Sequence, residues 1–344
     1  MIKILHSADW HIGAPLLGRE DLRQELLQIP GKLAALCRDE NCDLVLLSGD
    51  LFDGGYTRES LQILCSALEE MAVPVFITPG NHDFVGGQSP WLTESFPENV
   101  HIFKSNTIES VDLPECRVYG AGFTGMDCKA LLPGFRAESG KINIGIFHGD
   151  PTVAASPYNP ISRRQVEDSN LHYLALGHIH QAGSFSAGKT LCAWPGCPMG
   201  RGYDEEGEKG AYIVTVDSTV TARFVPLDTP RFYDLQGSVA DLDHLLPAAG
   251  SEDFYRITLT GEAESVDLAA LSQKYAHFPN LVLRDRTVPP VDIWGSAGQD
   301  SFEGVYFGLL HQAMEEAEDD QKEEILLAAK LSRQLLEGQE VVLP

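Results

Sequence analysis

Short apolar runs alternate with amphipathic stretches over the first two-thirds of the chain. Three runs, at residues 2–6, 44–47 and 73–78, have the length and apolar character of buried strands. Between them, residues 22–37 and 61–71 carry apolar positions at helical spacing. This order of strand, helix, strand, helix and strand predicts an α/β sheet with crossover helices.

The apolar runs that follow have fewer long helices between them. They fall at residues 142–147, 173–176, 212–216 and 221–225. Because long crossover helices accompany parallel pairing, their scarcity here predicts a second sheet that is more antiparallel than the first.

A domain boundary is predicted where two prolines, Pro226 and Pro230, bracket three residues. Beyond it, the pattern predicts a strand at 254–260, a helix at 268–275 and a strand at 281–283. These elements would form a small α+β unit. A segment rich in proline and glycine, residues 288–298, then leads into the last part of the chain.

The last part of the chain is predicted to be helical over residues 300–336. Asp300 with Glu303, and Asp320 with Glu323, have a spacing like that of a capping box, which favours two helices over one. The chain is therefore divided into three predicted segments. They are 1–228, 229–299 and 300–344.

Composition narrows the class of protein. The chain has 344 residues, of which 43% are hydrophobic and 22% charged, so it can bury a large core and is not of the disordered class. No apolar run is long enough for a transmembrane helix, and the first residues lack the pattern of a secretory signal. Seven cysteines, an odd number, disfavour a disulfide framework, so we expect a protein of the reducing cytoplasm with no membrane partner.

The charge of the chain is strongly negative. It has 25 basic and 50 acidic residues, a net charge of −25, which argues against a nucleic-acid binder that uses a broad basic face. Bound divalent cations or a basic partner can reverse the local field, so nucleic acid stays an open class. Residues 300–344, with eleven acidic and three basic residues, are the part least suited to contact phosphate.

Five short motifs, each at the end of an apolar run, carry the candidate chemistry. They are Asp9-Trp10-His11, Gly49-Asp50-Leu51-Phe52-Asp53, Gly80-Asn81-His82-Asp83, His148-Gly149-Asp150 and Gly177-His178-Ile179-His180. Each motif alone is more typical of a turn or of a hydrogen-bonded core histidine. Together they are informative, because functional sites of α/β sheets assemble at the carboxyl ends of strands. Residues two apart in an extended segment also face the same way, so Asp9 with His11, and His178 with His180, can each aim two side chains at one point.

The motifs supply seven candidate ligands that mix carboxylate, amide and imidazole groups. They are Asp9, His11, Asp50, Asn81, His148, His178 and His180. This mixture suits manganese, iron or zinc. Seven groups are too many for one ion and suit two ions that share Asp50. Two ions about 3.5–4 Å apart hold a phosphate and activate a water molecule, and their net positive charge attracts an anion to an acidic protein.

The motif series resembles that of the calcineurin-like metallophosphoesterase superfamily, which implies a four-layer αββα sandwich. Residues 4–13, residues 49–53 and the stretch from Trp194-Pro195-Gly196 through Lys209-Gly210 resemble the SbcD family of DNA repair exonucleases and its YhaO-like branch. The resemblance is close over about residues 1–225. It is looser over 229–290, which resembles that family's small capping domain, and over the tail it rests on helical pattern alone.

The resemblance implies a role for each residue. One metal ion would be bound by Asp9, His11, Asp50 and His180. The other would be bound by Asp50, Asn81, His148 and His178. His82 would stabilise the transition state and protonate the leaving oxygen, and Asp53 would orient His82. The resemblance also implies two divalent ions, Mn²⁺ with Fe²⁺, Zn²⁺ or Mg²⁺ as alternatives. It implies as well a DNA substrate, an SbcC-like ATPase with a coiled coil as partner, and a homodimer.

The tail offers one candidate docking face for that partner. Its apolar positions are Phe307, Leu310, Met314, Ile325, Leu331 and Leu335. Packing back onto this chain is an equal alternative for them. Residues 200–210 are charged and rich in glycine, which predicts a surface hairpin loop, with a segment bordering the substrate path as the alternative. Cys197 stands where many relatives have serine.

Three hypotheses for the function remain. The first is a two-metal DNA nuclease that works with an SbcC-like ATPase. The second is a small-molecule phosphodiesterase or phosphatase, such as one for cyclic nucleotides, which fits the net charge better but needs neither the cap nor the tail. The third, a scaffold without catalysis, ranks last because every motif position still carries a competent residue.

Overall fold

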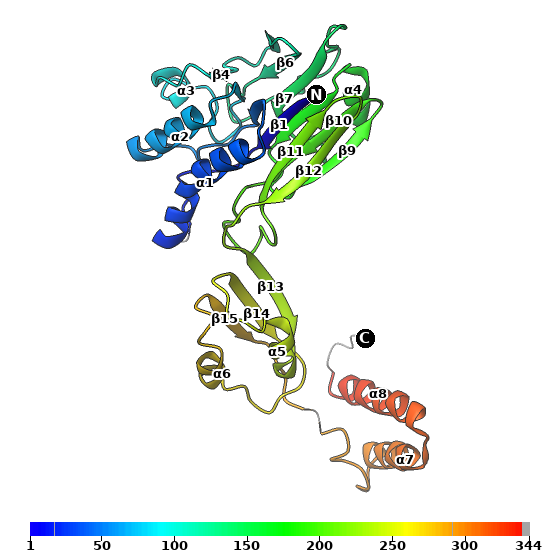
Figure 1. Ribbon diagram of the computed structural model, residues 1–344. Helices are drawn as coiled ribbons and strands as arrows, with labels where there is room; N and C mark the ends of the chain where they lie inside the picture. Colours follow the sequence, from blue (N-terminus) through cyan, green and yellow to red (C-terminus); the bar gives the residue numbers. More distant parts are fainter. Residues whose placement is uncertain (17, 291, 339–344) are drawn as a thin grey trace. The chain divides into compact units, whose positions relative to one another are not determined.

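The computed structural model describes residues 1–16, 18–290 and 292–338. The described chain divides into two compact units (Figure 1). The first unit comprises Met1–Asp234, Ser251–Arg256 and Phe278–Leu281. The remainder forms the second unit, from Leu235 onward. The division of the chain at residues 228 and 299 stays a prediction.

The first sheet of the first unit has six strands in the order β12-β11-β1-β2-β3-β4. Its strands are β1 (Ile2–Ser7), β2 (Leu44–Leu47), β3 (Val75–Ile77), β4 (Val100–Ile102), β11 (Gly210–Val216) and β12 (Val220–Pro226). Strands β1 to β4 run parallel, and helices α1 (Glu20–Asp39) and α2 (Arg58–Met71) are their first two crossovers. The predicted strands and helices of this region are therefore confirmed.

The second sheet has the order β5-β6-β7-β8-β10-β9. Its strands are β5 (Glu109–Asp112), β6 (Cys116–Ala121), β7 (Ile142–His148), β8 (Tyr173–Gly177), β9 (Gly183–Ala187) and β10 (Thr190–Trp194). Three of its five strand pairs are parallel, so the prediction of a more antiparallel second sheet was wrong. The antiparallel hairpin of β11 and β12 belongs instead to the first sheet, where β11 pairs with β1.

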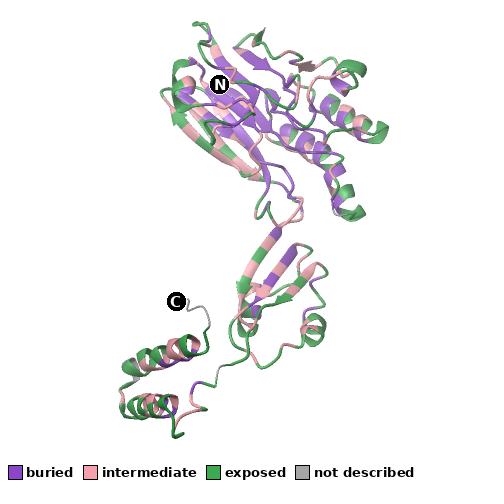
Figure 2. Cartoon of the chain, turned by 180° about the vertical axis from the view of Figure 1, so that it is seen from behind, coloured by how far each residue is buried: buried purple, intermediate pink, exposed green. Residues whose placement is uncertain are grey.

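The directions in which the side chains of the two sheets point define four layers, and this confirms the predicted αββα sandwich. Ile4 of β1 lies in a core cluster with Ile144 of β7, between the sheets. The neighbouring Leu5 points to the other face and packs with Leu33 of α1. Figure 1 shows α1 and α2 outside the first sheet, and Figure 2 shows the central strands of both sheets largely buried. The short helices α3 (Pro90–Thr93) and α4 (Arg163–Asp168) complete the unit.

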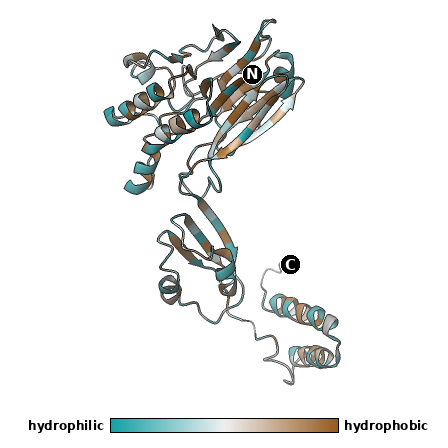
Figure 3. Cartoon of the chain, viewed as in Figure 1, coloured by the Kyte–Doolittle hydropathy of each residue, from teal (hydrophilic) through white to brown (hydrophobic). Residues whose placement is uncertain are grey.

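A three-stranded sheet follows, in the order β13-β14-β15. Its strands are β13 (Phe232–Gly237), β14 (Phe254–Leu259) and β15 (Leu281–Asp285), accompanied by η1 (Val239–Asp241), α5 (Leu242–Leu245) and α6 (Leu268–Lys274). Figure 3 shows hydrophobic and hydrophilic residues alternating along these strands. This pattern is typical of a sheet with one face covered and one face in solvent.

The tail forms two helices, as predicted: α7 (Phe302–Glu316) and α8 (Asp319–Leu336). The cap of α7 is Ser301, whose side chain accepts a hydrogen bond from the backbone of Gly304, and not Asp300 as the spacing suggested. Phe307 is fully buried in a small cluster with Ala329 of α8. It therefore packs within this chain and is not part of an exposed docking face.

Candidate metal centre

The seven predicted ligands meet at the carboxyl ends of strands from both sheets. Asp9 and His11 follow β1, Asp50 follows β2, and Asn81 follows β3. His148 ends β7, and His178 and His180 follow β8. Because these strands are parallel within each sheet, their ends lie on one edge of the sandwich. All seven side chains are in contact with another member of the group.

Four of these residues have a left-handed backbone. The φ angles are 55° for Asp9, 50° for His11, 53° for Asp50 and 99° for His178. Residues other than glycine pay about 1–3 kcal/mol for such angles, and they cluster at functional sites. Backbone hydrogen bonds hold the strain, such as the one from Asp9 N to the carbonyl of Gly49. The expectation that extended segments aim Asp9 with His11, and His178 with His180, was wrong, because turns with a left-handed backbone aim them.

Two groups of ligand atoms lie close together. Asp9, His11 and His180 form one group, and Asp9, Asp50 and His148 form another, each with its ligand atoms within 4.8 Å of one another. The Asp50 Oδ2 atom lies 3.4 Å from His148 Nε2 and 3.8 Å from His11 Nε2. Asp9 belongs to both groups, and the carboxylate of Asp50 lies between a histidine of each.

The amide of Asn81 completes the second group. Its Oδ1 atom lies 2.9 Å from His148 Nε2 and 3.2 Å from His178 Nδ1. Both oxygens of Asp9 accept from the backbone N–H of His178, at 2.9 and 3.0 Å, which ties the two sheets together at this edge. His178, like His148, therefore belongs to the group around Asp50 and Asn81.

The outer hydrogen bonds of the histidines fit a metal centre. His148 Nδ1 is 2.9 Å from the carbonyl of Ser48, His180 Nδ1 is 2.6 Å from Glu205, and His11 Nδ1 is 3.2 Å from Asp53. Each of these oxygens accepts the Nδ1 proton, which leaves the lone pair of Nε2 facing the centre. Metal-binding histidines are commonly oriented in this way, so the residues present fit divalent cations.

Two opposing effects act on the pKa of the buried Asp50 carboxyl. Burial raises the pKa of Asp50, but electrostatic attraction and hydrogen bonding from the His148 imidazole, with attraction from His11, outweigh it and hold this pKa below its ordinary value. The carboxylate of Asp50 also accepts a hydrogen bond of 2.9 Å from the backbone of His82. Asp50 is therefore an anion at neutral pH, which is the form that binds a cation.

His82 lies at the border of the centre and not among the inner ligands. Its side chain is 46% exposed, and its Nδ1 atom lies 2.7 Å from Asp53 Oδ1. That oxygen also accepts from His11 at 3.2 Å, and hydrogen bonding to His11 is the main cause that lowers the pKa of Asp53. Asp53 therefore links the half-exposed imidazole of His82 to the buried imidazole of His11.

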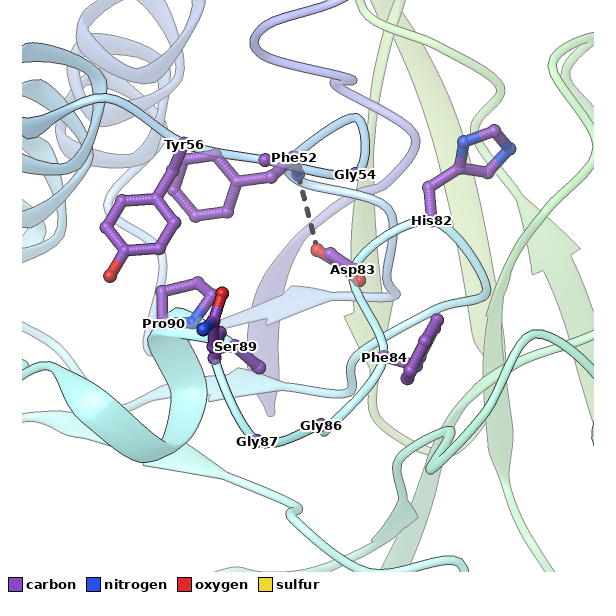
Figure 4. Close-up of a pocket in the computed structure, with 12 residues that line it drawn as sticks. Phe52, Gly54, Tyr56, His82, Asp83, Phe84, Gly86, Gly87, Ser89 and Pro90 are labelled. Carbon is purple, nitrogen blue, oxygen red and sulfur yellow. Dashed lines mark hydrogen bonds between the residues drawn. The ribbon is translucent and has the colours of Figure 1, made fainter.

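A pocket of about 470 Å³ borders the loop that carries His82. Figure 4 shows its wall of Phe52 and Tyr56 facing the loop of Gly86, Gly87 and Ser89, with the ring of His82 turned away from it. No lysine or arginine is among the described residues that line this pocket. The titratable groups that line it include His82 and Asp83, both from the loop after β3.

Sequence reasoning assigned no role to Asp83, the last residue of the Gly-Asn-His-Asp motif. Its carboxylate is buried and accepts three backbone N–H groups, from Gly80 at 2.7 Å, Leu51 at 2.8 Å and Phe52 at 3.3 Å. Asp83 thus holds the loop after β3 against the loop after β2. The clue in the sequence was the motif itself, since Asp commonly accepts from nearby backbone groups in turns.

Replacing Asp83 by alanine is expected to lower the free energy of unfolding by about 3 kcal/mol or more, because three buried N–H groups lose their acceptor. Urea unfolding of the metal-free protein measures the change. Asp217, an exposed residue of the turn between β11 and β12, provides the control, since its replacement by alanine should change stability by less than about 0.5 kcal/mol. Equal stabilities of the two variants would contradict the bracing role of Asp83.

The prediction of a surface hairpin loop at residues 200–210 was wrong. Glu205 is 7% exposed and Lys209 is 3% exposed, and Glu205 contacts His180 directly. Sequence reasoning missed these residues because a polar segment rich in glycine looks like solvent-exposed loop. The sequence feature that could have identified them is the stretch between two dipeptides, Pro195-Gly196 before the segment and Lys209-Gly210 at its end.

The chain belongs to the calcineurin-like phosphoesterase family, whose model matches residues 2–182. It is therefore a metallophosphoesterase, a hydrolase that uses divalent metal ions. Among known proteins it is similar to the uncharacterized metallophosphoesterase YhaO of Bacillus subtilis, with 30% identity over 241 residues. That match covers 62% of this chain and 57% of YhaO.

A second relative matches nearly the whole chain. It is the SbcD subunit of the nuclease SbcCD of Staphylococcus epidermidis, with 22% identity over 378 residues, 94% of this chain and 98% of that protein. Among solved structures, a dimetal phosphatase from Danio rerio has a TM-score of 0.45 and 13% identity, over 65% of this chain and 96% of that one. Within the described ranges, none of the helices combines the length and apolar character that a membrane span requires.

Proposed function

We propose that this chain hydrolyses phosphodiester bonds of DNA with two divalent ions, Mn²⁺ by preference, as the nuclease subunit of a DNA repair complex. The observation that carries the proposal is the pair of ligand groups, with the Asp50 carboxylate between His11 of one and His148 of the other, and with His82 half-exposed beside them. The relative named as a nuclease subunit supports it, since that match extends well beyond the matched family region into the sheet of β13 and the tail.

In this proposal each ligand group holds one ion. Asp9, His11, Asp50 and His180 bind the first ion. Asp50, Asn81, His148 and His178 bind the second ion. When bound, the two ions neutralise the charge of the phosphate and make a water molecule nucleophilic at neutral pH.

His82 and Asp53 serve the leaving group. The carboxylate of Asp53 holds Nδ1 of the imidazole, so the other ring nitrogen of His82 is free to carry a proton. The half-exposed position lets that nitrogen reach a bound phosphodiester. His82 then protonates the oxygen that leaves, as a general acid does.

The net charge of −25 indicates that DNA is held with the help of a partner. We propose an SbcC-like ATPase, whose coiled coil would cover the apolar residues that α7 exposes. Phe302, Val305 and Leu309 are 76%, 59% and 63% exposed, and their spacing places them close together on the helix. A homodimer is part of the same proposal, as is the cytoplasm, where the seven free thiols would stay reduced.

The experiment that tests the function compares two substrates. We expect the chain with Mn²⁺ to degrade end-labelled linear duplex DNA and to hydrolyse bis(4-nitrophenyl) phosphate, and both activities to disappear with EDTA and return with Mn²⁺. Hydrolysis of the small diester without any cleavage of DNA, alone or with the ATPase, would contradict the nuclease proposal.

The second candidate function is a phosphodiesterase or phosphatase for small molecules, such as cyclic nucleotides. The pocket beside His82 favours it, because aromatic side chains such as Phe52 and Tyr56 line it and could stack on the base of a nucleotide. A much larger kcat/KM for a cyclic nucleotide than for DNA would support this candidate.

A further inference from the structure

We propose that Glu205 is a positioning residue of the metal centre, which holds His180 in the orientation and tautomer that bind a cation, and that Arg201 in turn fixes Glu205. The inference rests on the proposed function in one respect, namely that His180 is a metal ligand. It assigns a role to a segment that lies beyond the motif containing His180.

The contacts form a chain from Arg201 through Glu205 to His180. Arg201 donates to Glu205 three times: from Nη2 to Oε1 at 2.6 Å, from Nε to Oε2 at 3.2 Å, and from its backbone N–H to Oε2 at 2.9 Å. Glu205 Oε1 also lies 2.6 Å from His180 Nδ1. The guanidinium therefore orients the carboxylate, and the carboxylate orients the imidazole.

These distances decide which nitrogen of His180 carries the proton. Arg201 Nη2 lies 3.0 Å from the same Nδ1 atom, so in principle Nδ1 could accept from the guanidinium. An unprotonated Nδ1 would then place its lone pair 2.6 Å from a carboxylate oxygen, which is repulsive. Nδ1 must therefore carry the proton and donate it to Glu205.

The consequence appears at the other ring nitrogen. With Nδ1 protonated, the Nε2 atom of His180 has a free lone pair, and this atom lies 3.2 Å from His11 Nε2 inside the first ligand group. A carboxylate on the outer nitrogen also makes the inner nitrogen a stronger donor to a cation. Glu205 thus acts on the centre through His180 and touches no substrate itself.

Burial explains why this segment is folded inward. The side chain of Glu205 is 7% exposed and that of Arg201 is 19% exposed, so each charge needs the other. Cys197, the residue that replaces the expected serine, packs against the same carboxylate, with its Sγ atom 3.7 Å from Oε2. Lys209 donates from Nζ to the carbonyl of His180 at 3.4 Å, so this segment also holds the backbone of the ligand.

Co²⁺ titration of the metal-free full chain, followed by visible absorption, tests the role of Glu205. The variant Glu205→Gln keeps an oxygen that can accept from Nδ1 but loses the charge, and we expect the affinity for one of two Co²⁺ ions to fall about 10-fold. Glu205→Ala loses both, and we expect a fall of about 100-fold with an altered absorption spectrum. Glu206→Gln is the matched control, because Glu206 is the exposed neighbour and the change in charge is the same.

The outcomes separate positioning from mere structural support. A graded loss of affinity from Glu205→Gln to Glu205→Ala, with Glu206→Gln like the wild type, supports the proposal. If Glu205→Gln lowers the unfolding temperature of the metal-free chain but binds Co²⁺ like the wild type, the residue is only structural and the proposal is wrong. A wild-type chain that binds no Co²⁺ contradicts the proposed function itself, which distinguishes the two failures.

Discussion

Replacement of His82 by alanine is expected to lower kcat for phosphodiester hydrolysis about 10²–10⁴-fold while the protein keeps both metal ions. The reason is the position of the imidazole, which lies beside the ligand groups without entering them and is held by Asp53 at 2.7 Å. Loss of the ring removes the proton donor for the leaving oxygen and leaves the ligands intact. Hydrolysis of bis(4-nitrophenyl) phosphate and metal content by atomic spectroscopy, measured on the same preparation, check the prediction.

A matched control for this variant is present in the tail. His311 is 41% exposed and lies 3.8 Å from a carboxylate of Glu315, which resembles the surroundings of His82. His311→Ala should leave kcat unchanged in the isolated chain. If His82→Ala loses its metal ions together with its activity, His82 acts as a ligand and the assignment of a general acid is wrong.

Replacement of Asp50 by asparagine is expected to abolish stable binding of the second metal ion and to lower kcat by roughly 10³-fold or more. Asparagine keeps the size of the side chain and can still accept from the backbone of His82, as Asp50 does at 2.9 Å. It loses the negative charge that lies between the two groups of histidines. Since metal ions contribute several kcal/mol of transition-state stabilisation, and each step of about 1.4 kcal/mol is tenfold, a loss of this size follows.

Metal stoichiometry at increasing Mn²⁺ measures this effect, with Asp217→Asn as a control of the same chemistry on the exposed turn between β11 and β12. The control should bind two ions and keep full activity. Two tightly bound ions in Asp50→Asn would show that the carboxylate is not shared. The two variants together separate proton transfer at His82 from metal binding at Asp50.

Much of the first unit of the fold could be predicted from the sequence, because the patterns that specify its strands and helices are local. The run at β2 is apolar throughout, because this parallel strand is buried on both faces, and the amphipathic helices on either side of it imply crossovers. The candidate ligands could be predicted because each follows an apolar run. Local patterns could not reveal β5, whose four residues are mostly exposed and only one of which is apolar.

Pairing between distant segments could not be predicted in the same way. The sequence of β11 and β12 is typical of an antiparallel hairpin. Nothing within it specifies that β11 pairs with β1, which lies at the other end of the first unit's sequence. That choice depends on which apolar faces fill the space between the sheets. The prediction therefore placed the strands correctly and assigned them to the wrong sheet.

The sequence by itself determined the class of elements, the edge of the sheet at which the candidate ligands gather, and the residue types that are suited to bind a cation. Only the tertiary structure decided how they are aimed, because the left-handed turns at Asp9 and Asp50 are held by backbone hydrogen bonds between loops. It also decided that Glu205 is buried, because its partner His180 comes from another loop. The charge and glycine content of this segment predict that its side chains are exposed. Glu205 is buried instead, because Arg201 and His180 both contact its carboxylate and compensate for its removal from water.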